Sequence, residues 1–189
     1  GAAVDVRELI LLGGGRGETR QLDQHISGMS FDGFESIWSY IVYGDGRVNI
    51  RHTVKPHGTM PPYLPRIGIT FVLDGSLSNV QWYGRGPQAN YPDRKSGYRV
   101  GIWNTTVEDM YEPYLIPQEY GLRTDNRRVR MTDSDGTGAE FSVDQLFNFN
   151  AYPYTTDNLT KAVYQYQLQK TEDITFNLDY ATSGVGCTA

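Results

Sequence analysis

The sequence predicts an all-β, antiparallel fold for this chain of 189 residues. Three observations support this prediction: apolar and polar residues alternate over long stretches, 14 Tyr stand against 7 Phe, and 21 Gly and 9 Pro provide many turns. Alternation with a period of two places one set of side chains on a buried sheet face and the other set in water. Amphipathic rings suit such half-buried surfaces. We therefore expect nine or ten strands and almost no helix.

The chain is expected to form one domain, because no linker divides it. Residues 1–36 are expected to be an irregular segment of that domain, and residues 37–189 are expected to form the sheets. The glycine-rich stretch at residues 13–17 lacks the lysine of a phosphate-binding loop and no clear helix follows it, so we interpret it as a turn.

Two hairpins are predicted from Asp-Gly pairs that lie between alternating stretches. This dipeptide tolerates the positive φ that a tight hairpin turn requires. Asp45-Gly46 separates predicted strands at residues 37–43 and 47–54, and Asp135-Gly136 separates predicted strands at residues 127–131 and 139–143.

The remaining segments complete the predicted all-β domain. The proline-rich residues 56–65 are interpreted as an irregular crossing between two sheets, since proline cannot donate to a strand ladder. Residues 156–159 begin with a capping residue and could open a single helical turn. Alternation predicts further strands at residues 164–168 and 174–180.

Composition excludes several classes of protein. The net charge of −5 argues against a nucleic-acid partner, because phosphate binding requires a basic surface. A single cysteine, Cys187, excludes a disulfide framework and a cysteine-based zinc finger. Since no apolar run approaches the ~20 residues of a membrane span, we expect no membrane partner.

Residues that could carry catalysis are few. The three histidines His25, His52 and His57 match no metal-ligand spacing, so we expect no metal site. The carboxylates Asp93, Glu119 and Asp125 lie in segments rich in Gly, Pro and Tyr, as site residues often do. Each also has an arginine nearby, so loop ion pairs explain them equally well.

The densest cluster of chemistry-bearing residues is residues 82–94, WYGRGPQANYPDR. Aromatic faces beside amide, carboxylate and guanidinium groups could hold a sugar by stacking and by paired hydrogen bonds. The alternative is a rigid corner, in which Gly and Pro set the turns and a hydrogen-bonded Asp93 holds the backbone. From the residues alone, the rigid corner is favoured.

Four sequence motifs indicate a resemblance to a known family. They are LPRIG (64–68), WYGRGP (82–87), NYPDR (90–94) and PQEYGLR (117–123), with NLD (177–179) and GVG (184–186) near the end. In this order and spacing they resemble the C-terminal small-chain domain of bacterial family 2 beta-galactosidases, from about residue 40 to residue 186.

The resemblance implies a large antiparallel β supersandwich, similar to the sugar-binding fold of galactose mutarotases. It implies a parent enzyme that is a retaining glycosidase acting on terminal β-D-galactosides such as lactose. Both catalytic carboxylates of that family lie in a separate (β/α)8 barrel, so we expect no catalytic residue here. We likewise expect no cofactor in this chain, and any magnesium or sodium ion would belong to other domains.

The sequence departs from the family in two places. Ala89 stands where the family commonly has Glu, and the chain offers no tryptophan after Gly186, where some members have one that reaches the sugar. We also expect the chain to be shorter than the family domain at both ends, with open sheet edges that lead to self-association and a homodimer as the expected state.

These observations favour a non-catalytic accessory domain that packs on the barrel and other domains of the parent enzyme and aids galactoside binding and assembly. The alternatives are an autonomous mutarotase-like epimerase using His52, and an autonomous carbohydrate-binding module. The compartment, bacterial cytoplasm or periplasm, stays open. The candidate carbohydrate-binding residues are Trp82, Tyr83, Arg85, Asn90, Tyr91, Asp93, Arg94, Glu119 and Arg123.

Overall fold

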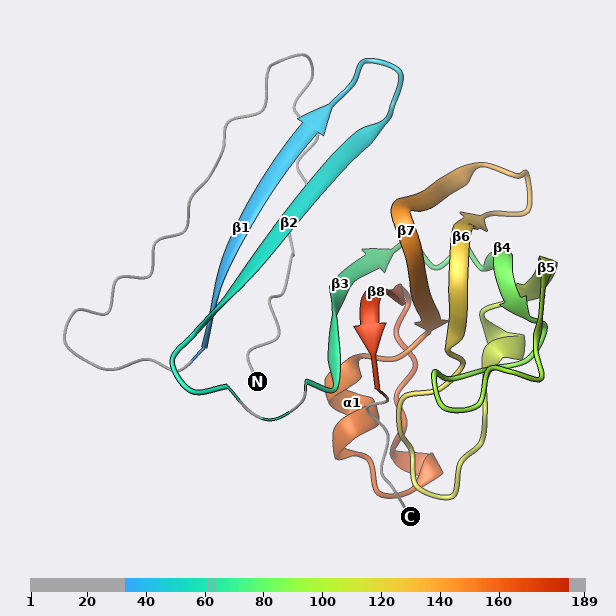
Figure 1. Ribbon diagram of the computed structural model, residues 1–189. Coiled ribbons are helices and arrows are strands. Elements are labelled where there is room, and N and C mark those ends of the chain that lie inside the picture. Colours follow the sequence, from blue (N-terminus) through green and yellow to red (C-terminus); the bar gives the residue numbers. More distant parts are fainter. Residues whose placement is uncertain (1–32, 61, 63, 184–189) are drawn as a thin grey trace. The chain divides into compact units, whose positions relative to one another are not determined.

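The computed structural model describes residues 33–60, 62 and 64–183 (Figure 1). These residues fall into two compact units, one before and one after residue 64, and each is described by itself. Eight strands account for most of them, and every strand pairing is antiparallel. The prediction of an antiparallel all-β fold is confirmed, with eight strands in the described part instead of nine or ten.

The first unit is a two-stranded hairpin of β1 (Gly33–Val42) and β2 (Val48–His57). Its turn is the predicted one, with Gly46 at φ 87°. β1 begins at Gly33, inside the segment that was expected to be irregular. Trp38 lies opposite His52 across the pair, and the two rings stack with centroids 3.7 Å apart.

The second unit is a six-stranded sheet in the order β3-β8-β7-β6-β4-β5. Its strands are β3 (Arg66–Leu73), β4 (Asn79–Gly86), β5 (Arg99–Thr106), β6 (Arg123–Thr132), β7 (Gly138–Tyr152) and β8 (Ile174–Thr182). The predicted turn at Asp135-Gly136 joins β6 to β7, with Gly136 at φ 84°. β2 ends at His57 and β3 begins at Arg66, so Pro56 and His57, which were predicted to lie in the irregular crossing, belong to β2 and pair with Phe34 and Gly33.

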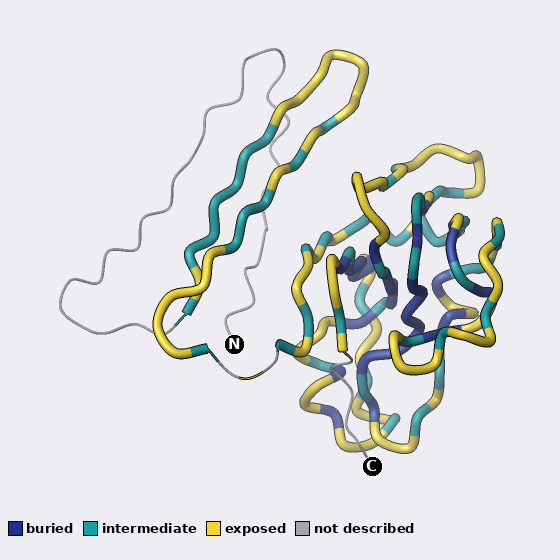
Figure 2. The backbone as a smooth tube through the Cα atoms, in the orientation of Figure 1, coloured by how far each residue is buried: buried dark blue, intermediate teal, exposed yellow. Residues whose placement is uncertain are grey.

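The core lies on one face of the six-stranded sheet, where large apolar side chains from neighbouring strands face one another. Trp82 of β4 pairs with Val129 of β6, and the ring of Trp82 meets Phe149 edge-on at 6.0 Å. Burial is concentrated on the central strands (Figure 2). The buried members of this core are Val80, Trp82, Val107, Met110, Val129, Met131, Phe147, Phe149, Ala151, Ile174 and Phe176.

The opposite face of β8 is buried too, but it is polar. Arg66 of β3 donates two hydrogen bonds to the carboxylate of Asp179, from Nε at 2.9 Å and from Nη2 at 2.7 Å. Asp179 is only 1% exposed. Gly68 makes room for this carboxylate, because a Cβ on Gly68 would lie 2.3 Å from the Asp179 Oδ1 atom.

A chain of amide hydrogen bonds extends this polar face across β7. Asn177 accepts from the Thr70 hydroxyl at 2.7 Å and donates to the Asn150 Oδ1 atom at 2.8 Å. Asn150 in turn donates to Glu119. Burial raises the pKa of Glu119 to about 7, although the positive charge of Arg66 acts in the opposite direction. Each buried polar group on this face therefore depends on its neighbour for hydrogen bonding.

Residues 164–168 do not form the predicted strand. Gln165–Gln167 form a 3₁₀ turn, η2, and the Gln167 Oε1 atom accepts from the backbone N–H groups of Val163 and Tyr164. A side chain that binds the local backbone in this way competes with a strand ladder. The two tyrosines at positions 164 and 166 stack on each other at 5.5 Å and are exposed, so their alternation does not reflect a buried face.

The helical content is as small as the sequence predicted. The predicted turn is α1 (Thr156–Lys161), but its cap is Thr155, one residue before the predicted one; the Thr155 hydroxyl accepts from the Asn158 N–H at 3.0 Å. A 3₁₀ turn, η1 (Glu108–Met110), follows β5. Among the described residues, no helix has the length and apolar character needed to cross a membrane.

The pair of Arg66 and Asp179 is expected to control the stability of the second unit. Arg66→Met should lower the free energy of unfolding by about 3 kcal/mol, because it leaves a carboxylate buried without a counter-charge. Adding Asp179→Leu should recover part of that loss. Urea denaturation of both variants measures the effect.

Arg47→Met is the matched control, because Arg47 pairs with Asp45 on an exposed turn, with side chains 72% and 55% exposed. We expect this variant to change the stability by less than about 1 kcal/mol. Equal effects of Arg66→Met and Arg47→Met would contradict the assignment.

Stability is also expected to depend on the ionisation of Glu119. The pKa of Glu119 is raised from 4.5 to about 7 in the folded protein, so the unfolded chain loses this proton first as the pH rises. The contribution of Glu119 to stability should therefore fall between about pH 4.5 and pH 7, by up to about 3 kcal/mol. Glu119→Gln, which keeps an oxygen acceptor for Asn150, should remove this part of the pH profile. Parallel wild-type and Glu119→Gln profiles in urea denaturation would refute the expectation.

Candidate functional site

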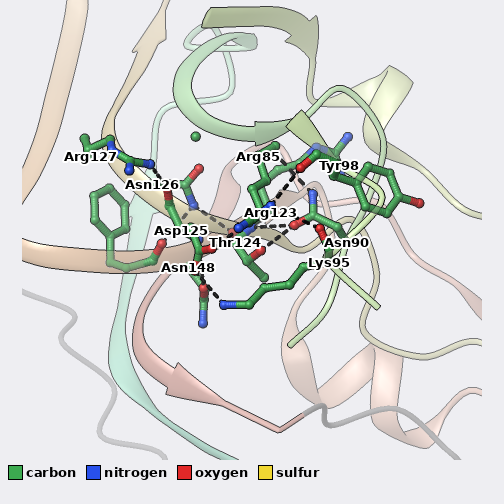
Figure 3. Close-up of polar contacts among 12 residues, drawn as sticks. Arg85, Asn90, Lys95, Tyr98, Arg123, Thr124, Asp125, Asn126, Arg127 and Asn148 are labelled. Atoms are coloured by element: carbon green, nitrogen blue, oxygen red, sulfur yellow. Dashed lines mark hydrogen bonds and ion pairs between the residues drawn. The ribbon is translucent and has the colours of Figure 1, made fainter. Parts of the chain in front are cut away.

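The candidate site is a corner between the end of β4 and the start of β6, with Asp125 at its centre (Figure 3). The Asp125 carboxylate accepts from the Arg85 Nε atom at 2.6 Å and from the Lys95 Nζ atom at 2.8 Å. Burial opposes ionisation of this group, yet the hydrogen bonds from Arg85 and Lys95 lower its pKa below the ordinary value. Asp125 is thus a carboxylate held ionised between two cations.

The backbone of β6 is bent to place Asp125 there. Asp125 has a φ of 54°, the one positive φ of a non-glycine residue in the described part of the chain. The pairing of β6 with β7 shifts register on both sides of Asn126, which marks an irregularity in the ladder. Asp tolerates the left-handed region better than most residues. The irregularity turns Asp125 towards Arg85 and Lys95 instead of continuing the strand.

Arg85 ties the following loop to this carboxylate. Its Nη1 atom donates to the carbonyl oxygens of Tyr98 at 2.8 Å and Lys95 at 3.2 Å. The guanidinium group therefore has three partners, one carboxylate at Nε and two backbone carbonyls at Nη1. This use fixes the loop and leaves Arg85 little freedom to bind a ligand.

Asn90 holds the other side of the corner and is fully buried. Its backbone N–H donates to the Leu122 carbonyl oxygen at 2.8 Å, and its Oδ1 atom accepts from the Thr124 N–H at 3.1 Å. Its Nδ2 atom donates to the Gln88 carbonyl oxygen at 3.0 Å. Both ends of the amide are used, so Asn90 acts as a structural clamp.

Trp82 and Arg123 lie beneath the corner. Trp82 is 1% exposed and donates from Nε1 to the Arg85 carbonyl oxygen at 2.9 Å, so its ring cannot stack on a sugar at the surface. The Arg123 guanidinium group lies 5.2 Å from the centre of the Trp82 ring and donates to the Gly121 carbonyl oxygen at 2.9 Å. Burial lowers the pKa of Arg123 to about 10. Its Nε atom has no hydrogen-bond partner among the described residues.

Four of the candidate residues reach the surface. Tyr83 is 41% exposed and lies under the Arg127 guanidinium group at 5.3 Å. Tyr91 is half-buried and lies under the Arg94 guanidinium group at 5.0 Å. Burial raises the pKa of Tyr91, with a further contribution from Glu119. These exposed rings and cations are the part of the candidate set that a ligand can reach.

Asp93, the fourth of these exposed residues, does not hold the corner as the sequence predicted. It is exposed, and within the described ranges it makes no hydrogen bond or ion pair. Asp125 has this role instead, because the bent strand brings it to Arg85 and Lys95, which lie 40 and 30 positions away along the chain. Glu119 lies in the buried network on β7 and β8, bound to Asn150, and is not part of the corner.

Sequence reasoning missed Lys95, Thr124 and Asn148 as members of this site. The Asn148 Oδ1 atom accepts from the Asp125 N–H at 3.4 Å, across the irregular part of the ladder. The available signal was the pair Asp125-Asn126, two residue types that tolerate a left-handed backbone, within an otherwise alternating strand. No local pattern identifies Asn148, because it lies 23 positions from Asp125.

Two of the histidine candidates, His52 and His57, lie among the described residues. His52 bonds to the Ser36 hydroxyl at 2.7 Å, and burial lowers its pKa. Among the described residues, no group of three or more His, Cys, Asp or Glu side chains could hold a metal ion. The glycine-rich stretch at 13–17, His25, the GVG motif and Cys187 lie outside the described residues.

Comparison with known proteins places this chain in a family. Residues 14–189 match the family described as "Beta galactosidase small chain". The chain is 34% identical over 148 residues to a beta-galactosidase of Priestia megaterium and 37% identical over 149 residues to one of Vibrio cholerae. These matches cover 78% and 79% of this chain but 14% of each relative, so the chain spans about one-seventh of their length. The chain belongs to the beta-galactosidase small-chain family.

Proposed function

We propose that this chain is the non-catalytic accessory domain of a larger beta-galactosidase that hydrolyses terminal β-D-galactosides. One observation carries the proposal: most of this chain matches proteins named beta-galactosidase, yet the match covers only about 14% of their length. The remaining length of such a protein has room for a separate catalytic domain. This chain then packs on that domain and supports its assembly.

The surroundings of the carboxylates support a structural role. Retaining glycosidases need two carboxyl groups about 5 Å apart, one of them free to donate a proton and the other free to attack. Asp125 is held by two cations, and Glu119 is 9% exposed and bound to Asn150. Both groups serve hydrogen bonding inside the domain.

Two surface features support contacts with a sugar and with other domains. Tyr83, Tyr91, Asp93 and Arg94 present exposed rings and charges of the kind that hold sugars, and we assign any contact with the galactoside to them. In the described part of the chain, β3 and β5 each pair with a single strand and are therefore sheet edges. We propose that other domains cover these edges in the larger enzyme and that a second copy covers them in the isolated chain.

A chimera tests the accessory role. The matching region of the Vibrio cholerae relative is replaced by this chain, and hydrolysis of nitrophenyl β-galactoside is compared with that of a variant lacking the region. We expect the chimera to be active, the deletion to be at least about tenfold less active because the catalytic domain loses its support, and the isolated chain to be inactive.

Two outcomes would overturn the proposal. The first is turnover by the purified isolated chain that scales with its concentration. The second is full activity of the variant from which the region has been deleted.

We expect the corner at Asp125 to contribute to the stability of the domain. Asp125→Asn should lower the free energy of unfolding by about 1–3 kcal/mol at pH 7, because Arg85 and Lys95 lose their shared carboxylate. Since the pKa of Asp125 is lowered in the folded state, this loss should shrink as the pH falls below the ordinary pKa of 3.8 and the folded carboxylate becomes protonated. Asp93→Ala, on the exposed side of the same corner, is the matched control and should change the stability by less than about 0.5 kcal/mol. If Asp125→Asn and Asp93→Ala lowered the stability equally in urea denaturation, Asp125 would not be the residue that holds the corner.

A further inference from the structure

The face of the six-stranded sheet opposite the apolar core carries exposed side chains along β4, β5 and β6. Trp82 of β4 points into the core, so the next residue, Tyr83, points to the other face. Tyr83 pairs with Ile102 of β5 on one side and with Arg128 of β6 on the other, which places the three side chains in one row. The residues of this surface, which we call the arginine face, are Tyr83, Val100, Ile102, Arg127, Arg128 and Arg130.

Cations outnumber carboxylates on the arginine face. Among the described residues, its three guanidinium groups have one carboxylate within ion-pair distance, that of Glu140, which lies 2.5 Å from the Arg130 Nε atom and 3.9 Å from the Arg128 Nη1 atom. The Asp125 carboxylate at the neighbouring corner is already shared by two other cations, and Arg127 reaches only its backbone carbonyl oxygen. The chain as a whole has a net charge of −5, so this face has the opposite sign.

The arginine side chains are held in place but keep unused donors. The Arg127 guanidinium group lies 5.3 Å from the centre of the Tyr83 ring and donates from Nη1 to the Asp125 carbonyl oxygen at 2.7 Å. A guanidinium group has five N–H donors in a planar fork that matches a carboxylate. A side chain that is ordered before binding loses less entropy when it binds. The face is therefore prepared for carboxylate partners.

Apolar side chains lie beside these cations. Ile102 is 59% exposed and Val100 is 42% exposed, and both point to the arginine face from β5. β5 is an edge strand of the sheet, so nothing in the described part of the sheet continues beyond them. Adjacent exposed apolar side chains of this kind are typical of surfaces that bind another protein. Together with the arginines they define the chemistry of the partner.

We propose that the arginine face binds an acidic protein surface, with carboxylates opposite Arg127 and Arg128 and apolar side chains opposite Val100 and Ile102. A protein fits better than a nucleic acid or another polyanion, because a polyanion makes no use of the apolar side chains and is repelled by the net charge of −5. Arginine and tyrosine are also enriched where proteins bind one another. That this acidic surface belongs to the catalytic domain of the larger beta-galactosidase rests on the proposed function.

The experiment compares the rate at which phenylglyoxal modifies Arg127 in the isolated chain and in the chimera with the Vibrio cholerae relative, measured by mass spectrometry. We expect modification at least about fivefold slower in the chimera, because groups at the centre of an interface are shielded from solvent. Arg128→Glu in the chimera should remove this protection by repelling the partner's carboxylates. Ile102→Ser should reduce the protection as well, because the partner loses an apolar contact. Both side chains are partly exposed, so the melting temperature of each isolated variant should match that of the wild type.

Lys161→Glu is the matched control. It changes the net charge as Arg128→Glu does, but it lies on α1 with its side chain 74% exposed, and we expect it to leave the protection of Arg127 unchanged. Equal loss of protection in Lys161→Glu and Arg128→Glu would overturn the proposal, because net charge alone would then explain the effect.

Three further outcomes would overturn the proposal. Arg127 could react equally fast in the isolated chain and in the chimera. Ile102→Ser could leave the protection intact, which would indicate a polyanion as the partner. Protection could already arise in the isolated chain as its concentration increases, which would assign the face to a second copy. The assay measures modification and not hydrolysis, so an active chimera with an unprotected Arg127 would contradict this docking surface alone.

Discussion

The buried pair of Arg66 and Asp179 is the interaction on which the six-stranded sheet depends. It joins β3 to β8 on a face where Asp179 is 1% exposed, and Gly68 is the residue that leaves room for it. A buried carboxylate without a counter-charge would be strongly unfavourable. The amide chain through Asn177 and Asn150 to Glu119 then extends the same face across β7. β8 is therefore apolar on one side and hydrogen-bonded on the other, and both sides must form together.

The corner at Asp125 depends on this frame. β6 lies between β7 and β4, and its irregular pairing with β7 turns Asp125 towards Arg85 and Lys95. Asn90 closes the same loop by using both ends of its amide on backbone and on Thr124. The family motifs WYGRGP and NYPDR thus contribute chiefly to holding the loop. The exposed ring of Tyr83 and the half-buried ring of Tyr91 lie at the outer side of this structure.

The surroundings of two carboxylates agree with the accessory role that we propose. Asp125 and Glu119 are used for internal hydrogen bonds, whereas glycoside hydrolysis needs two carboxyl groups that are free to react.

Local patterns in the sequence determined the antiparallel all-β class, both Asp-Gly hairpin turns, the capped helical turn and the strand at residues 174–180, because these depend on residues close together in the chain. The family motifs determined the family. Only the tertiary structure decided that Trp82 and Asn90 are buried, that Asp125 and not Asp93 holds the corner, and that residues 164–168 form a turn capped by Gln167. Such outcomes depend on partners such as Arg85 and Asp125, which lie 40 positions apart. A hydrogen bond between distant segments exists only once the sheet order brings them together, and period-two alternation does not encode that order.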